Sequence, residues 1–98
     1  MKTVPITINL NETKKRPYFL WDESLTVEEL HEILNSENMD KRLNYKARIL
    51  REARFEHVWE FLSVRDILAN WEHLKKRLGK KKAFWEFFLR KWREHGLI

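Results

Sequence analysis

The chain has 98 residues with a formal net charge of +5, and its 43% hydrophobic and 36% charged content indicates one globular domain rather than a disordered segment. It contains no cysteine, which excludes a disulfide scaffold, a thiolate metal site and a thiol nucleophile. Two glycines and two prolines are too few for a turn-rich all-β fold. No apolar segment resembles a secretory signal or a membrane span, so a cytoplasmic protein is expected.

The N-terminal residues show the alternation of a strand. The apolar positions of this pattern are Val4, Ile6, Ile8 and Leu10. Pro5 would restrict such a strand to the edge of a sheet, and the sequence offers no second strand to pair with it. Residues 1–17 are therefore predicted to form an extended or flexible arm, which is either frayed or offered as a strand to a partner protein.

The folded domain is predicted to begin after Pro17 with an extended apolar plug, residues 18–21, that packs into the core. The first helix should begin after Thr26, because this residue is a good N-cap and Glu29 completes a capping box. The helix should end near residues 35–38, where the apolar periodicity stops.

Four further helices are predicted, over residues 40–54, 55–62, 64–78 and 81–95. Ser63 should cap the third of these, with Asp66 completing its capping box. Gly79 interrupts the helical pattern, and Gly96 is placed to end the last helix. The predicted fold is therefore all-α, a single small five-helix domain over residues 18–98 preceded by the extended arm.

Positive charge is concentrated toward the C-terminus. Residues 75–98 contain nine Lys/Arg and two Glu, a net charge of +7, whereas residues 1–74 contain eleven Lys/Arg and thirteen acids, a net charge of −2. Six cations lie within eight residues, here called the basic turn: Lys75, Lys76, Arg77, Lys80, Lys81 and Lys82. Such a localised field indicates an acidic partner, which is a nucleic acid, an anionic membrane or an acidic protein face.

The last predicted helix carries a wide apolar stripe. Its members are Phe84, Trp85, Phe88, Leu89 and Trp92. With Phe87, which lies beside it, the stripe spans more than half of the helix circumference, so the helix is covered on several sides or leaves aromatic rings exposed. We predict that Phe87, together with Trp59, lies in an exposed patch that serves as a protein interface.

Three uses of the basic turn stay open at this stage. For nucleic acid, Lys80, Lys81 and Lys82 would open the last helix and add to the attraction of its free N–H groups for phosphate, although that helix has aromatic rings where a recognition helix needs polar side chains. For a membrane, the Lys- and aromatic-rich helix would lie in the interface. Otherwise the rings belong to the core and the lysines to a solvated loop.

Patterns typical of catalytic or metal sites are not found. The four histidines form no His-x-x-x-His pair, and the two glycines do not form a phosphate-binding loop. Ser24, Ser36 and Ser63 occupy positions typical of caps and turns rather than of nucleophiles. We therefore expect no enzymatic activity, no cofactor and no metal site.

Asp22 is the one acid that follows the apolar plug directly. Arg54 lies on the apolar side of the second predicted helix, at its C-terminal end, whereas Arg48 lies nearer the polar face. We predict a buried Asp22–Arg54 ion pair that fixes how the plug docks on this helix, a structural role rather than a catalytic one.

Three stretches of the chain together resemble a family of small helical bacterial proteins. They are residues 18–22 with 25–29, then 47–59, then 83–87. This antitoxin-like family is encoded beside AbiEii-type nucleotidyltransferase toxins, and the similarity covers residues 18–95. The resemblance implies a non-catalytic protein-binding module, an accessory of a nucleotidyltransferase-like partner, and no known active site. Nucleic-acid binding through residues 75–82 is the alternative, and homo-oligomerisation stays open.

Overall fold

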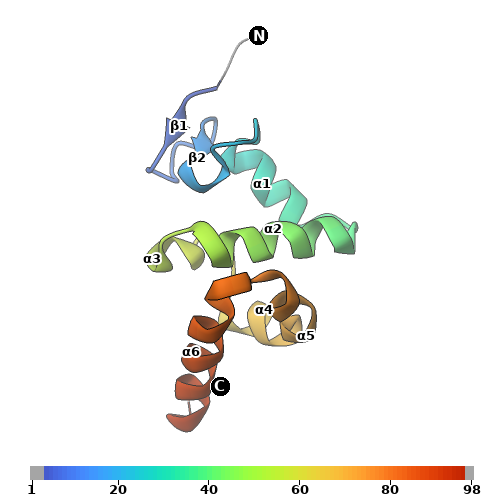
Figure 1. Ribbon diagram of the computed structural model, residues 1–98. Coiled ribbons are helices and arrows are strands. Elements are labelled where there is room, and N and C mark those ends of the chain that lie inside the picture. The colour runs from blue at the N-terminus through green and yellow to red at the C-terminus, as the bar shows by residue number, and fades with distance from the viewer. Residues whose placement is uncertain (1–3, 97–98) are drawn as a thin grey trace.

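The computed structural model describes residues 4–96, which are mostly helical. The α-helices are α1 (Val27–Leu34), α2 (Met39–Glu52), α3 (Phe55–Val58), α4 (Val64–Ala69), α5 (Trp71–Leu74) and α6 (Lys82–Glu94). Helix α2 crosses the middle of the molecule, with the N-terminal segment and α1 on one side and α4, α5 and α6 on the other (Figure 1). The predicted all-α class is confirmed at this level, although a very small sheet is also present.

Local capping signals correctly located two helix starts. In α1 the Thr26 hydroxyl accepts a hydrogen bond from the Glu29 N–H at 3.1 Å, and the Glu29 carboxylate accepts one from the Thr26 N–H at 3.0 Å. Ser63 and Asp66 form the same reciprocal box at the start of α4. Each box satisfies backbone donors that have no partner within the helix, which is why these starts can be predicted from sequence.

The helix predicted over residues 64–78 is not continuous, and this prediction is wrong. Asn70 adopts φ −111° and ψ 11°, which ends α4 and begins α5. Its side-chain amide donates a hydrogen bond to the Asp66 carbonyl at 2.9 Å, the kind of local bond by which asparagine competes with a helix. A 3₁₀ turn, η2 (Lys75–Arg77), follows α5, and the helix predicted over residues 55–62 is also shorter, because α3 ends at Val58.

The N-terminal strand has a partner within the chain, contrary to the sequence prediction. Strand β1 (Ile6–Thr7) pairs in parallel with β2 (Arg16–Pro17). The same segment also holds the start of α1, because the Val27 N–H donates to the Lys15 carbonyl at 2.9 Å and the Glu28 N–H to the Thr13 carbonyl at 3.0 Å. The segment therefore supplies acceptors to N–H groups that α1 cannot satisfy itself.

The core lies around α2. Phe19 and Leu20 of the apolar plug are buried against it, as predicted. The plug is not extended, however, because it forms the 3₁₀ turn η1 (Tyr18–Leu20), and Trp21 does not pack into the core, since its side chain is 64% exposed. On the opposite side Trp85 of α6 is only 2% exposed, and its indole N–H donates to the Leu50 carbonyl at 2.9 Å. Helix α6 is thus attached to α2 by a buried ring and a buried hydrogen bond.

Candidate functional surface

The basic turn is held in place by its few apolar and backbone groups. Leu78 is 1% exposed and lies between η2 and the next 3₁₀ turn, η3 (Gly79–Lys81), while Gly79 adopts φ +53°, a conformation that favours glycine. Arg51 of α2 donates a hydrogen bond from Nη1 to the Arg77 carbonyl at 2.8 Å. With Leu78 pointing inward, the lysines on either side are directed to the surface.

Only two of the six cations in the basic turn have an acidic partner within the described residues. Lys75 pairs with Glu72 at 2.8 Å and Arg77 with Asp40 at 3.5 Å. The hydrogen bond from Lys75 lowers the pKa of Glu72. The remaining four, Lys76, Lys80, Lys81 and Lys82, are exposed, and no ion pair involves them in residues 4–96. Their charge is therefore available to a partner.

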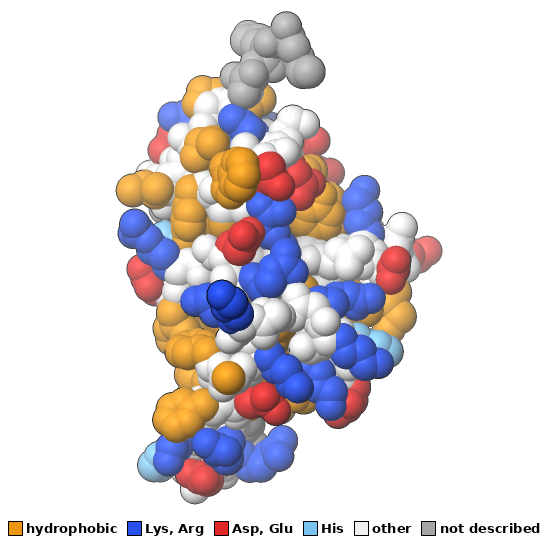
Figure 2. All heavy atoms as spheres, in the orientation of Figure 1, with side chains coloured by type: hydrophobic (Ala, Val, Ile, Leu, Met, Phe, Trp, Pro, Cys, Tyr) orange, Lys and Arg blue, Asp and Glu red, His pale blue; other side chains and the backbone are white. Residues whose placement is uncertain are grey.

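Beside the basic turn, α3, the residue that follows it and α6 form a continuous group of rings, here called the aromatic face. It consists of Phe55, Trp59, Phe84, Phe88 and Trp92. Phe88 is at the centre, with ring centroids 5.2 Å from Phe55, 5.8 Å from Trp59 and 5.1 Å from Trp92. Phe55 and Phe84 remain 41% and 46% exposed. Figure 2 shows hydrophobic side chains at the edge formed by α3 and α6, next to many Lys and Arg side chains.

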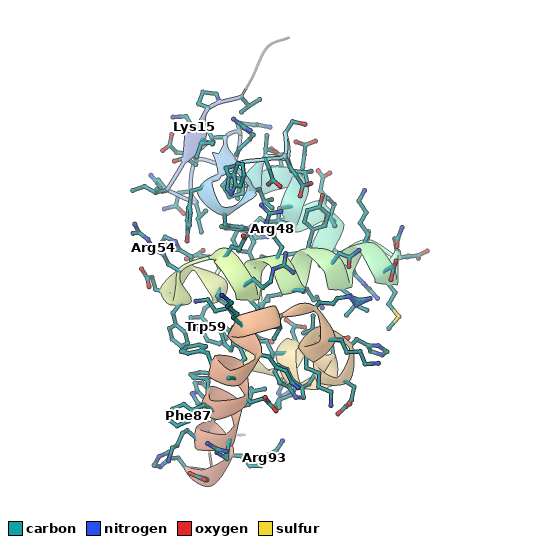
Figure 3. The ribbon with its side chains drawn as sticks, in the orientation of Figure 1. Lys15, Arg48, Arg54, Trp59, Phe87 and Arg93 are labelled. Carbon is teal, nitrogen blue, oxygen red and sulfur yellow. The ribbon has the colours of Figure 1, made fainter. Side chains whose placement is uncertain are left out.

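Phe87 is 51% exposed, consistent with its predicted position at the margin of the stripe. Two cations cover its ring, with Arg90 Cζ at 5.7 Å and Lys91 Nζ at 5.6 Å from the centroid. Trp59 is half-buried within the aromatic face, whereas Phe87 lies farther along α6 (Figure 3). The use of either residue in an interface stays a prediction.

The buried ion pair predicted between Asp22 and Arg54 is wrong in its cation and in its burial, because Asp22 pairs with Arg48 and its side chain is 41% exposed. The Asp22 carboxylate accepts hydrogen bonds from both Nη atoms of Arg48, and this lowers the pKa of Asp22 and raises that of Arg48. Arg48 also donates from Nε to the Phe19 carbonyl at 3.2 Å, so it does dock the apolar plug on α2 (Figure 3).

Arg54 is displaced because α2 ends before it. Helix α2 stops at Glu52, Ala53 has an extended backbone with ψ 151°, and Arg54 becomes the N-cap of α3. Its backbone N–H donates to the Tyr18 hydroxyl at 2.6 Å, and its guanidinium Cζ lies 5.9 Å from the centroid of the Tyr18 ring. Extending the helical periodicity by two residues placed Arg54 on a face that it does not occupy.

Three cavities border these features. One of ≈ 320 Å³ is lined by Arg48, Arg51, Tyr45, Glu23 and Asn44. A second cavity, of ≈ 290 Å³, lies between α6 on one side and α4 and α5 on the other. The third, of ≈ 180 Å³, lies where the end of α2, the start of α3 and the start of α6 meet, and Lys81 of the basic turn and Phe84 of the aromatic face both line it.

Two negative observations concern only the described part of the chain. Within residues 4–96 no three His, Asp or Glu side chains lie close enough together to hold a metal ion. Within the same range no helix combines the length and apolar character needed to cross a bilayer.

Two residues of this surface were not singled out in the sequence, Arg51 and Phe55. Phe55 has a recognisable signal, since it follows the end of a helix and opens a short apolar segment. Arg51 has none, because its bond to the Arg77 carbonyl joins segments 26 residues apart.

No family model, curated protein or solved structure matches this chain significantly. The resemblance to the antitoxin-like family consequently stays a prediction from the sequence.

Proposed function

We propose that this protein is a non-catalytic protein-binding module that presents the aromatic face and the basic turn to an acidic partner protein. The observation that supports this proposal is the shared cavity at which Lys81 meets Phe84, because it joins unneutralised charge to half-exposed rings. Interfaces combine a desolvated aromatic centre with a polar rim, and apolar surface that a monomer leaves exposed beside charge is typical of them.

The position of the lysines adds to this argument. Helix α6 has no side-chain N-cap and no acid in its first turn, and it begins with Lys81 and Lys82 at the positive end of its dipole. Cations at this end disfavour the helix by about 0.3–1 kcal/mol each. Lysines placed where they cost stability are consistent with a role in binding anionic groups.

Binding of nucleic acid through the basic turn is the second candidate. The four exposed lysines favour it, because each can contact a phosphate. The protein reading is preferred because the surface next to them is made of hydrocarbon rings rather than of side chains that hydrogen-bond to base edges.

The resemblance found in the sequence makes a nucleotidyltransferase encoded by a neighbouring gene the first partner to test, with this protein as its antitoxin-like accessory. The experiment is co-purification from the native host with the neighbouring protein untagged. Direct binding of the two purified proteins and of DNA and RNA oligonucleotides should then be measured over a range of salt concentrations.

The decisive variant changes Lys80, Lys81 and Lys82 to Glu. We expect it to stay folded, since acids are favourable at the start of a helix, and to bind the nucleotidyltransferase at least about tenfold more weakly. Lys81→Glu alone should weaken binding more than Lys41→Glu, a matched charge reversal in the first turn of α2. Retained partner binding with lost oligonucleotide binding would reverse the ranking of the two candidates.

A further inference from the structure

The cavity of ≈ 180 Å³ has a composition suited to one particular occupant. Its lining consists of Leu50, Ala53, Phe55, Lys81, Phe84 and Trp85. Building on the proposed function, we propose that this cavity is an anchor pocket for one aliphatic side chain, leucine or isoleucine, in an acidic segment of the partner protein.

The size of the pocket argues for a side chain rather than a small molecule. Sites for cofactors and drug-sized ligands are typically about 300–1,000 Å³, which is larger than this cavity of ≈ 180 Å³. An apolar protein cavity of about 150 Å³ holds a benzene molecule, so the pocket has the volume for a branched aliphatic group. Ala53 has the smallest side chain of the lining, a single methyl group.

The chemistry of the walls selects an apolar group. Trp85 has the only hydrogen-bonding side chain in the lining besides Lys81, and its indole N–H is already donated to the Leu50 carbonyl at 2.9 Å. Lys81 is therefore the one side chain of the pocket with free donors. A nucleobase would leave its donors and acceptors largely unmatched here, whereas a leucine side chain loses nothing.

The pocket is formed before any partner binds. Leu50 and Trp85 are both 2% exposed, so the floor is fixed by the core. The Ala53 N–H is bonded to the Ile49 carbonyl at 3.0 Å, which fixes the wall between α2 and α3. A preformed pocket lowers the ordering cost of binding, which is a property of interface hot spots.

Charge determines what flanks the anchoring side chain. Lys81 is at the rim, Lys80 and Lys82 adjoin it in sequence, and residues 75–98 carry a net charge of +7. A second copy of this chain would bring the same positive charge to the same place, which disfavours self-association. Carboxylates on either side of the aliphatic residue complement the lysines, so the occupant is an acidic segment of another protein.

Three synthetic 12-residue peptides test the proposal with the full chain. The first has one central leucine among glutamates, the second replaces that leucine with alanine, and the third replaces the glutamates with lysines. Binding is measured by isothermal titration calorimetry, which applies equally to the wild-type chain and to its variants. We expect the leucine peptide to bind about tenfold or more tightly than the alanine peptide, and the lysine peptide not to bind.

Ala53→Leu fills the pocket without changing surface charge, and it should make the leucine and alanine peptides bind equally. Should this variant fail to fold, Phe84→Ala removes an exposed wall and should reduce the preference for leucine. Equal binding of both peptides to the wild-type chain would overturn the pocket. The proposal would also be overturned if a 12-nucleotide oligothymidylate bound the wild-type chain and Ala53→Leu weakened this binding, because the pocket would then accept a base.

The two proposals fail in different ways. Suppose that the nucleotidyltransferase binds, that its binding is lost on charge reversal of residues 80–82, and that Ala53→Leu leaves this binding unchanged. The anchor-pocket proposal is then wrong and the proposal of a binding module stands. If neither acidic peptide nor the nucleotidyltransferase is bound by the wild-type chain, both are wrong.

Discussion

The two sides of α2 differ in whether their cationic side chains form ion pairs within the chain. On the side of the N-terminal segment, ion pairs join separate elements of the chain: Arg48 contacts Asp22 and Glu23, and Lys14 pairs with Glu28 at 2.6 Å. On the other side, Lys76, Lys80, Lys81 and Lys82 are unneutralised within residues 4–96, and rings are half-exposed beside them. Because neutralised charge has little left to offer a partner, the difference supports the proposal that the second side is the one that binds.

The helix starts on the two sides differ in the same way. Helix α1 has Glu28 and Glu29 in its first turn and a complete capping box, so charge, dipole and hydrogen bonds agree. Helix α6 has lysines at its start and no side-chain cap. Agreement among local signals is typical of parts that only have to fold, and conflict among them is expected where a surface also has to bind.

The largest difference in stability is expected between two substitutions in α6, one of a buried ring that attaches the helix to α2 and one of an exposed ring. Trp85→Ala should lower the free energy of unfolding by about 3–5 kcal/mol, because it removes a buried ring and leaves the Leu50 carbonyl without its donor. Phe87→Ala should change it by less than about 0.5 kcal/mol, since this ring is 51% exposed. Urea unfolding measures both.

A large destabilisation by Phe87→Ala would mean that this ring supports the fold, and the argument for a partner would lose one of its exposed residues. Phe87→Ala should weaken partner binding although it hardly changes stability. Its binding to the nucleotidyltransferase should therefore be measured together with its unfolding.

What the sequence revealed depended on how local the signal was. The capping boxes at Thr26 and Ser63 involve residues three apart, so they could be located without any tertiary information. The pairing of β1 with β2 could not, because each strand has two residues and a run of two has no periodicity. The break at Asn70 had a signal in the residue type, but the apolar positions on either side kept the helical spacing.

The candidate functional surface was predictable in composition but not in arrangement. The basic turn and the exposed Phe87 follow from counting charges and from the width of the stripe on α6. The pocket shared by Ala53, Lys81 and Phe84 joins three segments whose relative position depends on packing, and no spacing in the sequence encodes it. The choice of Arg54 instead of Arg48 as the partner of Asp22 has a different cause, because the predicted helix was extended two residues beyond its end at Glu52.

The second prediction tests the side of the N-terminal segment by removing its central cation. Arg48→Met should lower the free energy of unfolding at neutral pH by about 1–3 kcal/mol, because it leaves Asp22, Glu23 and Glu52 close together with no cation between them. Arg54→Met is the matched control, and it should cost less than about 0.5 kcal/mol because Arg54 is exposed. Chemical unfolding at pH 7 compares them, and a larger loss for Arg54→Met would restore the pairing first predicted.

The same pair of variants should differ in acid. Arg48 holds the pKa of Asp22 below its usual value of 3.8, so the ionised carboxylate stabilises the fold above that pH. This contribution is lost as the pH falls through the lowered pKa of the folded state. The stability curve of Arg48→Met below about pH 4 should therefore be flatter than that of Arg54→Met, and identical slopes would show that the Asp22–Arg48 pair contributes nothing.

The smallest effect is expected from Tyr45, at high pH. Burial, and then the hydrogen bond that its hydroxyl donates to Glu23, raise the pKa of Tyr45 from 10.0 to about 12. Between these values the unfolded chain releases the phenolic proton while the folded chain keeps it, so stability falls as the pH rises from about 10 toward about 12. Tyr45→Phe should reduce this fall, although burial also raises the pKa of Tyr18, which therefore leaves a residual slope. Thermal unfolding from pH 8 to 11 measures the difference, with Tyr18→Phe as the comparison. An unchanged slope in Tyr45→Phe would show that the Tyr45 hydroxyl is solvated and does not form the hydrogen bond with Glu23 in the folded protein.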